Sequence, residues 1–149
     1  MQIYPDFRAF VELLNAQRVE YLIIGAHALA FHGRPRYTND LDVFVRRSPE
    51  NLSALLRVLD AFGFASLNLT QDDFGPDSFV QLGVAPVRID LTTSISGLDF
   101  EEAWASRIEG ELGGLPVLFP SIESYIKNKR ASGRPKDLAD IDELSGGGA

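Results

Sequence analysis

Apolar and polar residues alternate along the chain with periods that predict short helices and strands. Apolar residues three and four positions apart follow Pro5, which is favoured in the first turn of a helix, and predict a helix from there to about Arg18. The apolar run 21–24 ends at Gly25 and predicts a buried strand. The small-residue segment 26–32 predicts a short helix, so the chain begins as helix, strand and helix.

The remainder of the chain continues this pattern. Ser48 is a capping residue that opens a helix, and the apolar stripe of that helix ends before Gly63. The apolar-rich runs 79–82 and 87–92 flank a turn and predict a β-hairpin. The other expected elements are a loop over 67–77, a helix over 100–107, a strand over 115–119, and helices over 120–132 and 135–144.

This order of elements predicts a single α/β (α+β) domain over residues 1–144, with a flexible tail over 145–149. A chain of 149 residues with 45% hydrophobic and 23% charged residues is long enough to bury the core of one domain. We expect a mixed, mostly antiparallel sheet of about four or five strands, with helices packed on one side and acidic residues on the other.

Charge and composition exclude several classes of function. The 14 basic and 21 acidic residues give a net charge of −7, which disfavours broad attachment to nucleic acid or to an anionic membrane. The absence of cysteine excludes disulfides, thiolate zinc sites and cysteine nucleophiles. The first residues lack the pattern of a signal peptide, and no apolar stretch has membrane-spanning length. We therefore expect a cytoplasmic protein without a membrane partner.

The segment 38–45 carries the first candidate chemistry. Successive side chains of a strand point to opposite faces, so Asp40, Asp42 and Phe44 share one face and the aliphatic residues between them share the other. Two carboxylates on a half-buried face repel each other, and a divalent cation with oxygen ligands would relieve that repulsion. A solvated strand edge with two surface acids is the alternative interpretation.

The segment 87–91 repeats this arrangement, with Arg88 and Asp90 on one face and three aliphatic residues on the other. If both strands join one sheet, three aspartates converge on its open face. They could then hold one or two Mg²⁺ ions that clamp a triphosphate for in-line displacement at phosphorus. Asp90 could also take the proton from an attacking hydroxyl. The alternative is that Asp90 is hydrogen-bonded or paired with an arginine.

Gly25 adds a second feature in front of the acidic strand. A helix that begins after a glycine offers free N–H groups and a positive dipole end to a phosphate. One glycine alone is a weak indication of such a site, but its position ahead of Asp40 strengthens it.

Together these residues resemble a known signature. Gly25-Ala26, then Asp40-x-Asp42, then Asp90 between aliphatic residues resembles the pattern of nucleotidyltransferases of the DNA polymerase β superfamily. That family usually has glycine or serine where Ala26 stands. Alanine offers no hydroxyl, so a phosphate contact there falls to the backbone or is missing, which bears on catalytic strength more than on fold.

The resemblance extends over nearly the whole chain. Segments 24–33, 38–42 and 127–140 are similar to minimal bacterial and archaeal members, including those related to toxin–antitoxin and abortive-infection systems. The resemblance implies a polymerase-β-like fold and an enzyme that uses an NTP with Mg²⁺ or Mn²⁺. It also implies that the three catalytic acids bind the metal and that two further residues approach the nucleotide. The three acids are Asp40, Asp42 and Asp90. The two residues that approach the nucleotide are Gly25 and Ala26.

Candidates for further nucleotide contacts lie around these motifs. His27 is expected to line the pocket near Gly25, and the arginines and lysines are expected to contact nucleotide or acceptor. Exposed loop arginines, and helix lysines neutralised by nearby acids, are the alternatives. The candidates are His27, Arg34, Arg36, Thr38, Lys127 and Lys136, and the two lysines belong to a basic cluster over 127–136 that also holds Lys129, Arg130 and Arg134.

The resemblance implies transfer of a nucleoside monophosphate to a hydroxyl of a protein or RNA acceptor. Larger relatives carry an acceptor-binding domain that this chain has no room for, so we expect a toxin-like partner protein, an RNA or a homo-oligomer to complete the site. An alternative is a binding module that neutralises a partner by contact, which Ala26 favours and the three acids oppose. A hydrolase that uses the same acids is a third hypothesis.

Overall fold

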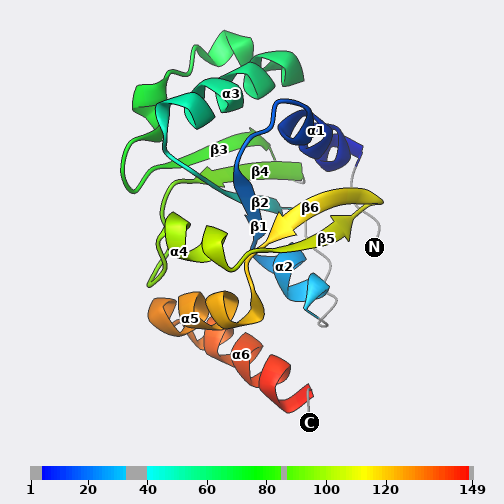
Figure 1. The fold of residues 1–149 in the computed structure, drawn as a ribbon, viewed down its shortest axis with the longest axis vertical. Helices are drawn as coiled ribbons and strands as arrows, with labels where there is room; N and C mark the ends of the chain where they lie inside the picture. Colours follow the sequence, from blue (N-terminus) through cyan, green and yellow to red (C-terminus); the bar gives the residue numbers. More distant parts are fainter. Residues whose placement is uncertain (1–4, 33–39, 85–86, 148–149) are drawn as a thin grey trace.

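A four-stranded sheet with the strand order β1-β2-β4-β3 forms the centre of the protein (Figure 1). The central strands, β2 (Asp40–Val45) and β4 (Val87–Thr92), are parallel, and both outer pairs are antiparallel. The outer strands are β1 (Tyr21–Ile24) and β3 (Phe79–Val84). The sheet is therefore mixed and mostly antiparallel, as predicted. The residues described by the computed structural model are 5–32, 40–84 and 87–147.

One face of the sheet carries the main hydrophobic core. Leu41, Val43 and Val45 of β2 point into this core and are fully buried. Helices α1 (Pro5–Ala16) and α3 (Pro49–Leu59) contribute their apolar stripes to it and lie together beside the sheet (Figure 1). Burial of these side chains is the main source of stability for the fold. The core faces away from the aspartates, which therefore lie on the opposite face of β2.

The opposite face is only partly covered. Phe44 of β2 lies on it and packs edge-on against Phe100 of helix α4 (Phe100–Ala105), with 5.1 Å between the ring centroids. This contact belongs to a second, smaller core. The prediction of helices on one side holds for α1 and α3, whereas α4 packs on the aspartate face because the apolar ring of Phe44 there needs cover.

A second sheet of two strands extends the fold. Strands β5 (Ile108–Leu112) and β6 (Leu115–Phe119) form an antiparallel hairpin, and β6 lies against β1. Phe119 stacks on Phe31 at the end of helix α2 (Ala26–Phe31), with 4.3 Å between the ring centroids. The sequence predicted β6 but not β5, because the outward side chains of β5 are glutamates that do not indicate a strand.

Two C-terminal helices complete the fold. Helix α5 (Ile122–Ser132) begins after the capping residue Ser121 and ends at Gly133, whose φ of +67° is left-handed. Helix α6 (Pro135–Gly147) packs against α5 (Figure 1). It continues past its predicted end to Gly147, and the predicted domain bounds and flexible tail stay predictions.

The other predicted elements agree with the structure except near their ends. Helix α1 ends two residues before its predicted end at Arg18. Among the described residues, no helix is both long enough and apolar enough to cross a bilayer. Three short helical turns follow α3 where the sequence predicted a helix end and a loop: η1 (Asp60–Phe64), η2 (Ala65–Leu67) and η3 (Gln71–Phe74).

Candidate active site

Strand register brings two of the predicted acids side by side. Strands β2 and β4 pair in parallel with Asp42 opposite Asp90, so both carboxyl groups lie on the aspartate face of the sheet. The aliphatic residues on either side of each aspartate point into the core and fix this orientation. Asp90 is only 6% exposed. The two carboxyl groups thus meet in a partly dehydrated place.

The electrostatics of this pair disfavour two negative charges. Burial, followed by the neighbouring carboxylates of Asp90 and Asp40, raises the pKa of Asp42 to about 7. Protonated Asp42 can donate a hydrogen bond to Asp90. Oδ1 of Asp90 is nevertheless buried without a hydrogen-bond partner in the described part of the chain. A buried carboxylate oxygen of this kind is costly, and a bound cation would satisfy it.

Asp40 is held in a different way. The register places it beside Arg88, whose Nε and Nη2 donate to its two carboxylate oxygens, each at 3.1 Å. Arginine pairing was an alternative for Asp90, but Arg88 pairs with Asp40 instead. Within residues 5–32, 40–84 and 87–147, no three acidic or histidine side chains are arranged as a ready metal centre. Arg88 therefore compensates the charge of Asp40 within the chain.

Gly25 lies directly against Asp42. Its φ is +73°, in the left-handed region that glycine adopts without strain. A Cβ atom at this position would also overlap Oδ2 of Asp42. The turn between β1 and α2 therefore brings the backbone close to the Asp42 carboxylate. Both the positive φ and this close approach require glycine at position 25.

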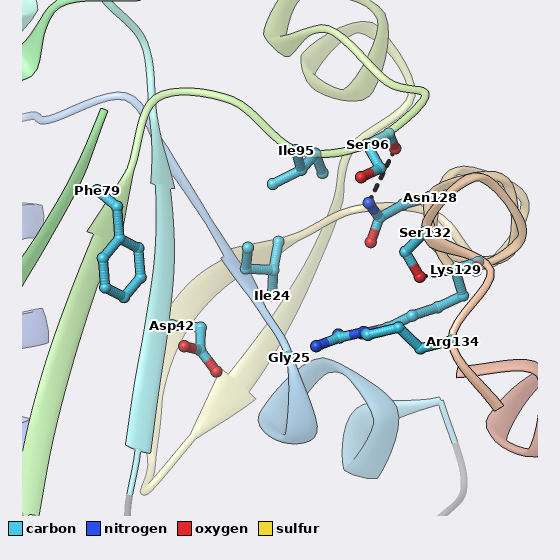
Figure 2. Close-up of a pocket in the computed structure, with 10 residues that line it drawn as sticks. All are labelled: Ile24, Gly25, Asp42, Phe79, Ile95, Ser96, Asn128, Lys129, Ser132 and Arg134. Atoms are coloured by element: carbon cyan, nitrogen blue, oxygen red, sulfur yellow. Dashed lines mark hydrogen bonds between the residues drawn. The ribbon is translucent and has the colours of Figure 1, made fainter. Parts of the chain in front are cut away.

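Asp42 and Gly25 line a pocket of about 540 Å³ (Figure 2). The opposite wall comes from the end of α5 and the segment between α5 and α6, and its charged members are Lys129 and Arg134, which we call the basic wall. Figure 2 shows both side chains extending into the pocket, Lys129 from α5 and Arg134 from the connection that follows it. The pocket therefore has an acidic side and a basic side. Its other lining residues are Ile24, Phe79, Ile95, Ser96, Asn128 and Ser132.

A buried carboxylate lies behind the basic wall. Asp137, in the first turn of α6, accepts hydrogen bonds from Nε of Arg134 at 2.7 Å and from the hydroxyl of Ser132. Its Oδ1 is 3.4 Å from Nζ of Lys129. Burial alone would raise the pKa of Asp137, but the hydrogen bonds from Arg134 and Ser132 and the two neighbouring positive charges outweigh it and lower the pKa to about 2.

The structure separates the lysines of the basic cluster. The ammonium group of Lys127 pairs with Glu102 of α4 at 2.6 Å and 2.8 Å, and the side chain does not line the Asp42 pocket. Lys136 is exposed and lies outside that pocket as well. Helical phase is the signal that distinguishes them, because Lys129 follows the buried Tyr125 by one turn and so shares the inward side of α5.

His27 lies in the core and not in the pocket lining. It is 6% exposed and packs edge-on against Phe7, with 5.9 Å between the ring centroids. Burial is the main cause of its lowered pKa, so the structure favours a neutral ring. The remaining predicted contacts, Arg34, Arg36, Thr38 and the side chain of Ala26, lie outside what the structure describes, and their roles stay predictions.

A family model matches residues 7–145 of the chain. The chain belongs to the DUF6036 family, described as a nucleotidyltransferase of unknown function. This membership confirms the resemblance to nucleotidyltransferases that the acidic signature indicated. The match does not extend to the toxin–antitoxin grouping. Comparison with curated proteins finds no match.

Solved structures confirm the fold class of this DUF6036 member. TM1012 from Thermotoga maritima, a candidate nucleotidyltransferase, has a TM-score of 0.62 at 15% identity, over 98% of this chain and 96% of its own. The antibiotic-resistance factor ANT(2'')-Ia has a TM-score of 0.62 at 15% identity, and the match covers 97% of this chain and 83% of its own. Its complex with adenylyl-2''-tobramycin has a TM-score of 0.61 at 14% identity, over 96% and 87%. At such identities the likeness shows a shared fold alone.

Proposed function

We propose that this DUF6036 protein transfers a nucleoside monophosphate from an NTP to an acceptor hydroxyl in the pocket between Asp42 and the basic wall. The observation that carries the proposal is the Asp42–Asp90 pair: Asp42 lines the pocket opposite Lys129 and Arg134, and Asp90 beside it has a buried oxygen without a partner among the described residues. A metal-bound triphosphate complements both sides, because its cation suits the acids and its phosphates suit the basic wall.

The residues around the pocket suit in-line displacement at phosphorus. A bond forms between the acceptor oxygen and the α-phosphorus, and the bond from that phosphorus to the bridging oxygen breaks, so that pyrophosphate leaves. Lys129 and Arg134 stabilise the negative charge that develops on the phosphates. Asp90 is the proposed general base that takes the proton of the acceptor hydroxyl.

Asp42 and Asp90 fit a divalent cation, because their carboxyl groups meet and one buried oxygen is unsatisfied. Asp40 would be the third ligand, with its carboxylate also hydrogen-bonded to Arg88. Mg²⁺ or Mn²⁺, when bound, supplies positive charge that offsets the charges of the carboxylates and phosphates.

The proposed acceptor is a hydroxyl of a protein or RNA brought by another chain, such as a toxin-like partner or a second copy of this protein. Phe79 supports an acceptor on the β3 side of the pocket, because its side chain lines the pocket and is 62% exposed. ANT(2'')-Ia was solved with adenylyl-2''-tobramycin, an adenylylated small molecule, so tobramycin belongs among the acceptors to test.

A second candidate function is neutralisation of a partner by contact, with weak or no transfer. Two observations favour it: alanine stands at position 26, and Arg88 occupies the carboxylate of Asp40. This binding function differs from the transferase in one respect that can be measured. Complex formation by contact does not need the charge of Asp42 or Asp90.

The test uses purified protein with each α-labelled NTP, Mg²⁺ or Mn²⁺, and tobramycin or a cell lysate as acceptor. We expect label on an acceptor with the wild type, and a loss on the order of 10³-fold with Asp42→Asn, because the site loses a cation ligand. Asp142→Asn is the matched control, since Asp142 is an exposed acid of α6 outside the pocket.

The outcomes separate the two functions. Equal labelling by the wild type and Asp42→Asn excludes these acids as the catalytic site. If the NTP binds but no acceptor is labelled, and a partner co-purifies equally with both proteins, contact is the function. If no NTP binds with either metal, the proposed transfer is wrong.

A further inference from the structure

We propose that Asp137 is a positioning residue for the NTP: from behind the pocket it holds Lys129, Arg134 and Ser132 where the phosphates bind. This inference rests on the proposed function, because it assigns the phosphates to the basic wall. Asp137 is 1% exposed and does not line the pocket, so it acts on a ligand only through the residues that it contacts.

The contacts of Asp137 all lead to the pocket. Arg134 donates to it twice, from Nε at 2.7 Å and from Nη2 at 3.3 Å, and the hydroxyl of Ser132 donates to Oδ2. Nζ of Lys129 is 3.4 Å from Oδ1. These partners come from α5 and from the segment before α6, and all three line the pocket (Figure 2). One carboxylate therefore fixes the relative position of both cations of the basic wall.

The cations differ in how much they need this support. The side chain of Lys129 is only 14% exposed, whereas that of Arg134 is 70% exposed and would be free to sample several rotamers. A phosphate that binds a disordered arginine must pay for ordering it, and a side chain held in place beforehand avoids that cost. The bidentate contact with Asp137 leaves the guanidinium oriented before the nucleotide arrives.

Charge compensation is a competing role for Asp137, and it predicts the opposite change in ATP affinity. If it only offset positive charge, its removal would leave two uncompensated cations and tighten the binding of phosphates. If it positions those cations, its removal weakens the binding. The direction of the change in ATP affinity therefore distinguishes positioning from simple charge compensation.

The experiment measures the dissociation constant of ATP with Mg²⁺ by calorimetry for Asp137→Asn in two backgrounds, the wild type and Lys129→Met/Arg134→Gln. In the wild-type background we expect ATP to bind about tenfold more weakly, because both cations lose their fixed orientation. In the second background the residues on which Asp137 acts are already neutral. There we expect the same substitution to change the affinity by less than about twofold.

Several results would overturn the inference. Tighter or unchanged ATP binding by Asp137→Asn excludes positioning. An equal loss in both backgrounds assigns Asp137 a purely structural role. If the wild type and Lys129→Met/Arg134→Gln bind ATP equally, the basic wall does not hold phosphates, and this inference fails even where transfer depends on Asp42. If the wild type neither binds ATP nor labels any acceptor, the proposed function fails as well.

Loss of folding does not block the test. Asp137→Asn leaves Lys129 and Arg134 without their counter-ion, and circular dichroism shows whether the variant folds. If it does not, Asp137→Glu keeps the charge and displaces it by one methylene, and we expect ATP to bind it about threefold more weakly. Equal affinity of Asp137→Glu and the wild type then overturns the inference. Asp137→Asn combined with Lys129→Met/Arg134→Gln leaves no uncompensated cation, so this source of instability is absent from it.

Discussion

The pKa values of two carboxyl groups, one lining the pocket and one behind its basic wall, are shifted in opposite directions. Asp42 has a pKa raised to about 7, with burial and two further acids as the causes. Asp137 is almost fully buried, yet its pKa is lowered to about 2, because hydrogen bonds and two cations outweigh the burial. Burial is common to both, so the neighbours decide the direction of the shift.

This difference in surroundings distinguishes Asp42, whose charge calls for a ligand, from Asp137, whose charge is already compensated by the chain. Around Asp137, every charge has a counter-charge within the chain. Around Asp42 and Asp90 the chain supplies further negative charge and leaves a buried oxygen without a partner in the described residues. Such an arrangement lowers the stability of the protein and is typical of functional sites. Each experiment below perturbs one wall and uses the other, or a matched residue elsewhere, as its reference.

Among these experiments the largest effect is expected for Gly25→Ala, which acts on the acidic side of the pocket at Asp42. Alanine at φ +73° is strained, and its Cβ displaces the Asp42 carboxylate, so we expect transfer to fall on the order of 10²–10³-fold. Gly63→Ala is the control: its φ is +107°, but no atom lies within 4 Å of the added Cβ.

Both glycine variants should lose about 1–3 kcal/mol of unfolding free energy from backbone strain. Only Gly25→Ala should lose transfer, as measured by the rate of acceptor labelling. Equal rates for the two variants would show that the contact between Gly25 and Asp42 has no role in the reaction.

The second prediction concerns the unfolding free energy, which substitution of Asp137 should lower and substitution of Asp42 should raise. Asp137→Asn removes the counter-ion of two cations and should lower the unfolding free energy by about 3 kcal/mol. Asp42→Asn removes one of two acids in contact. It should raise the unfolding free energy at pH 8 by about 1–2 kcal/mol, less than the full shift implies, because the pocket is open to water.

The pH dependence sharpens this contrast. Native Asp42 binds its proton more tightly than unfolded Asp42, so its penalty is absent below about pH 4 and grows as the pH rises to about 7. The gain from Asp42→Asn should therefore vanish at pH 4. Asp137 has the opposite dependence: its contribution is complete above about pH 4 and is lost as the pH falls towards 2. Urea unfolding in the presence of a chelator measures both. A gain from Asp42→Asn that is equal at pH 4 and pH 8 would contradict the shift.

The contrast also shows what the sequence could predict. Strand alternation placed Asp40 and Asp42 on one face of their strand and Arg88 and Asp90 on one face of theirs, and the acidic signature led to the family and the fold class. These inferences use spacing within one strand, which the backbone geometry of a strand fixes. Which of the two aspartates of β2 meets Arg88 depends on register between strands far apart in the chain. No local pattern sets that register.

The basic wall was harder to predict for a related reason. Lys127, Lys129 and Arg134 lie in one basic segment, and only the rotation of α5 against the sheet decides which side chains enter the pocket. Asp137 resembled a surface acid that neutralises nearby lysines. Its burial results from the packing of α6 on α5, which the amphipathic pattern of either helix does not specify.

Lys129 joins the two walls, and its substitution provides the last and smallest test. Its charge lowers the pKa of Asp42, and its Nζ is 3.4 Å from the carboxylate of Asp137. Lys129→Met should weaken ATP binding about five- to tenfold, because one phosphate contact is lost. Lys127→Met removes the same side chain two positions earlier in α5, where it pairs with Glu102 outside the pocket. It should change the affinity by less than about twofold, since an exposed ion pair contributes little.

The same pair of variants also tests whether the two walls are electrostatically coupled. Without the Lys129 charge, Asp42 loses a neighbouring positive charge, so its pKa should rise further, and the loss of Mn²⁺ affinity between pH 8.5 and pH 7 should be larger than in the wild type. Lys127→Met should leave the pH dependence of Mn²⁺ binding as it is in the wild type. If Lys129→Met weakens ATP binding but leaves the Mn²⁺ profile unchanged, the walls act on separate parts of the nucleotide. A shifted profile would mean that the basic wall also sets the charge state of the acids that receive the metal.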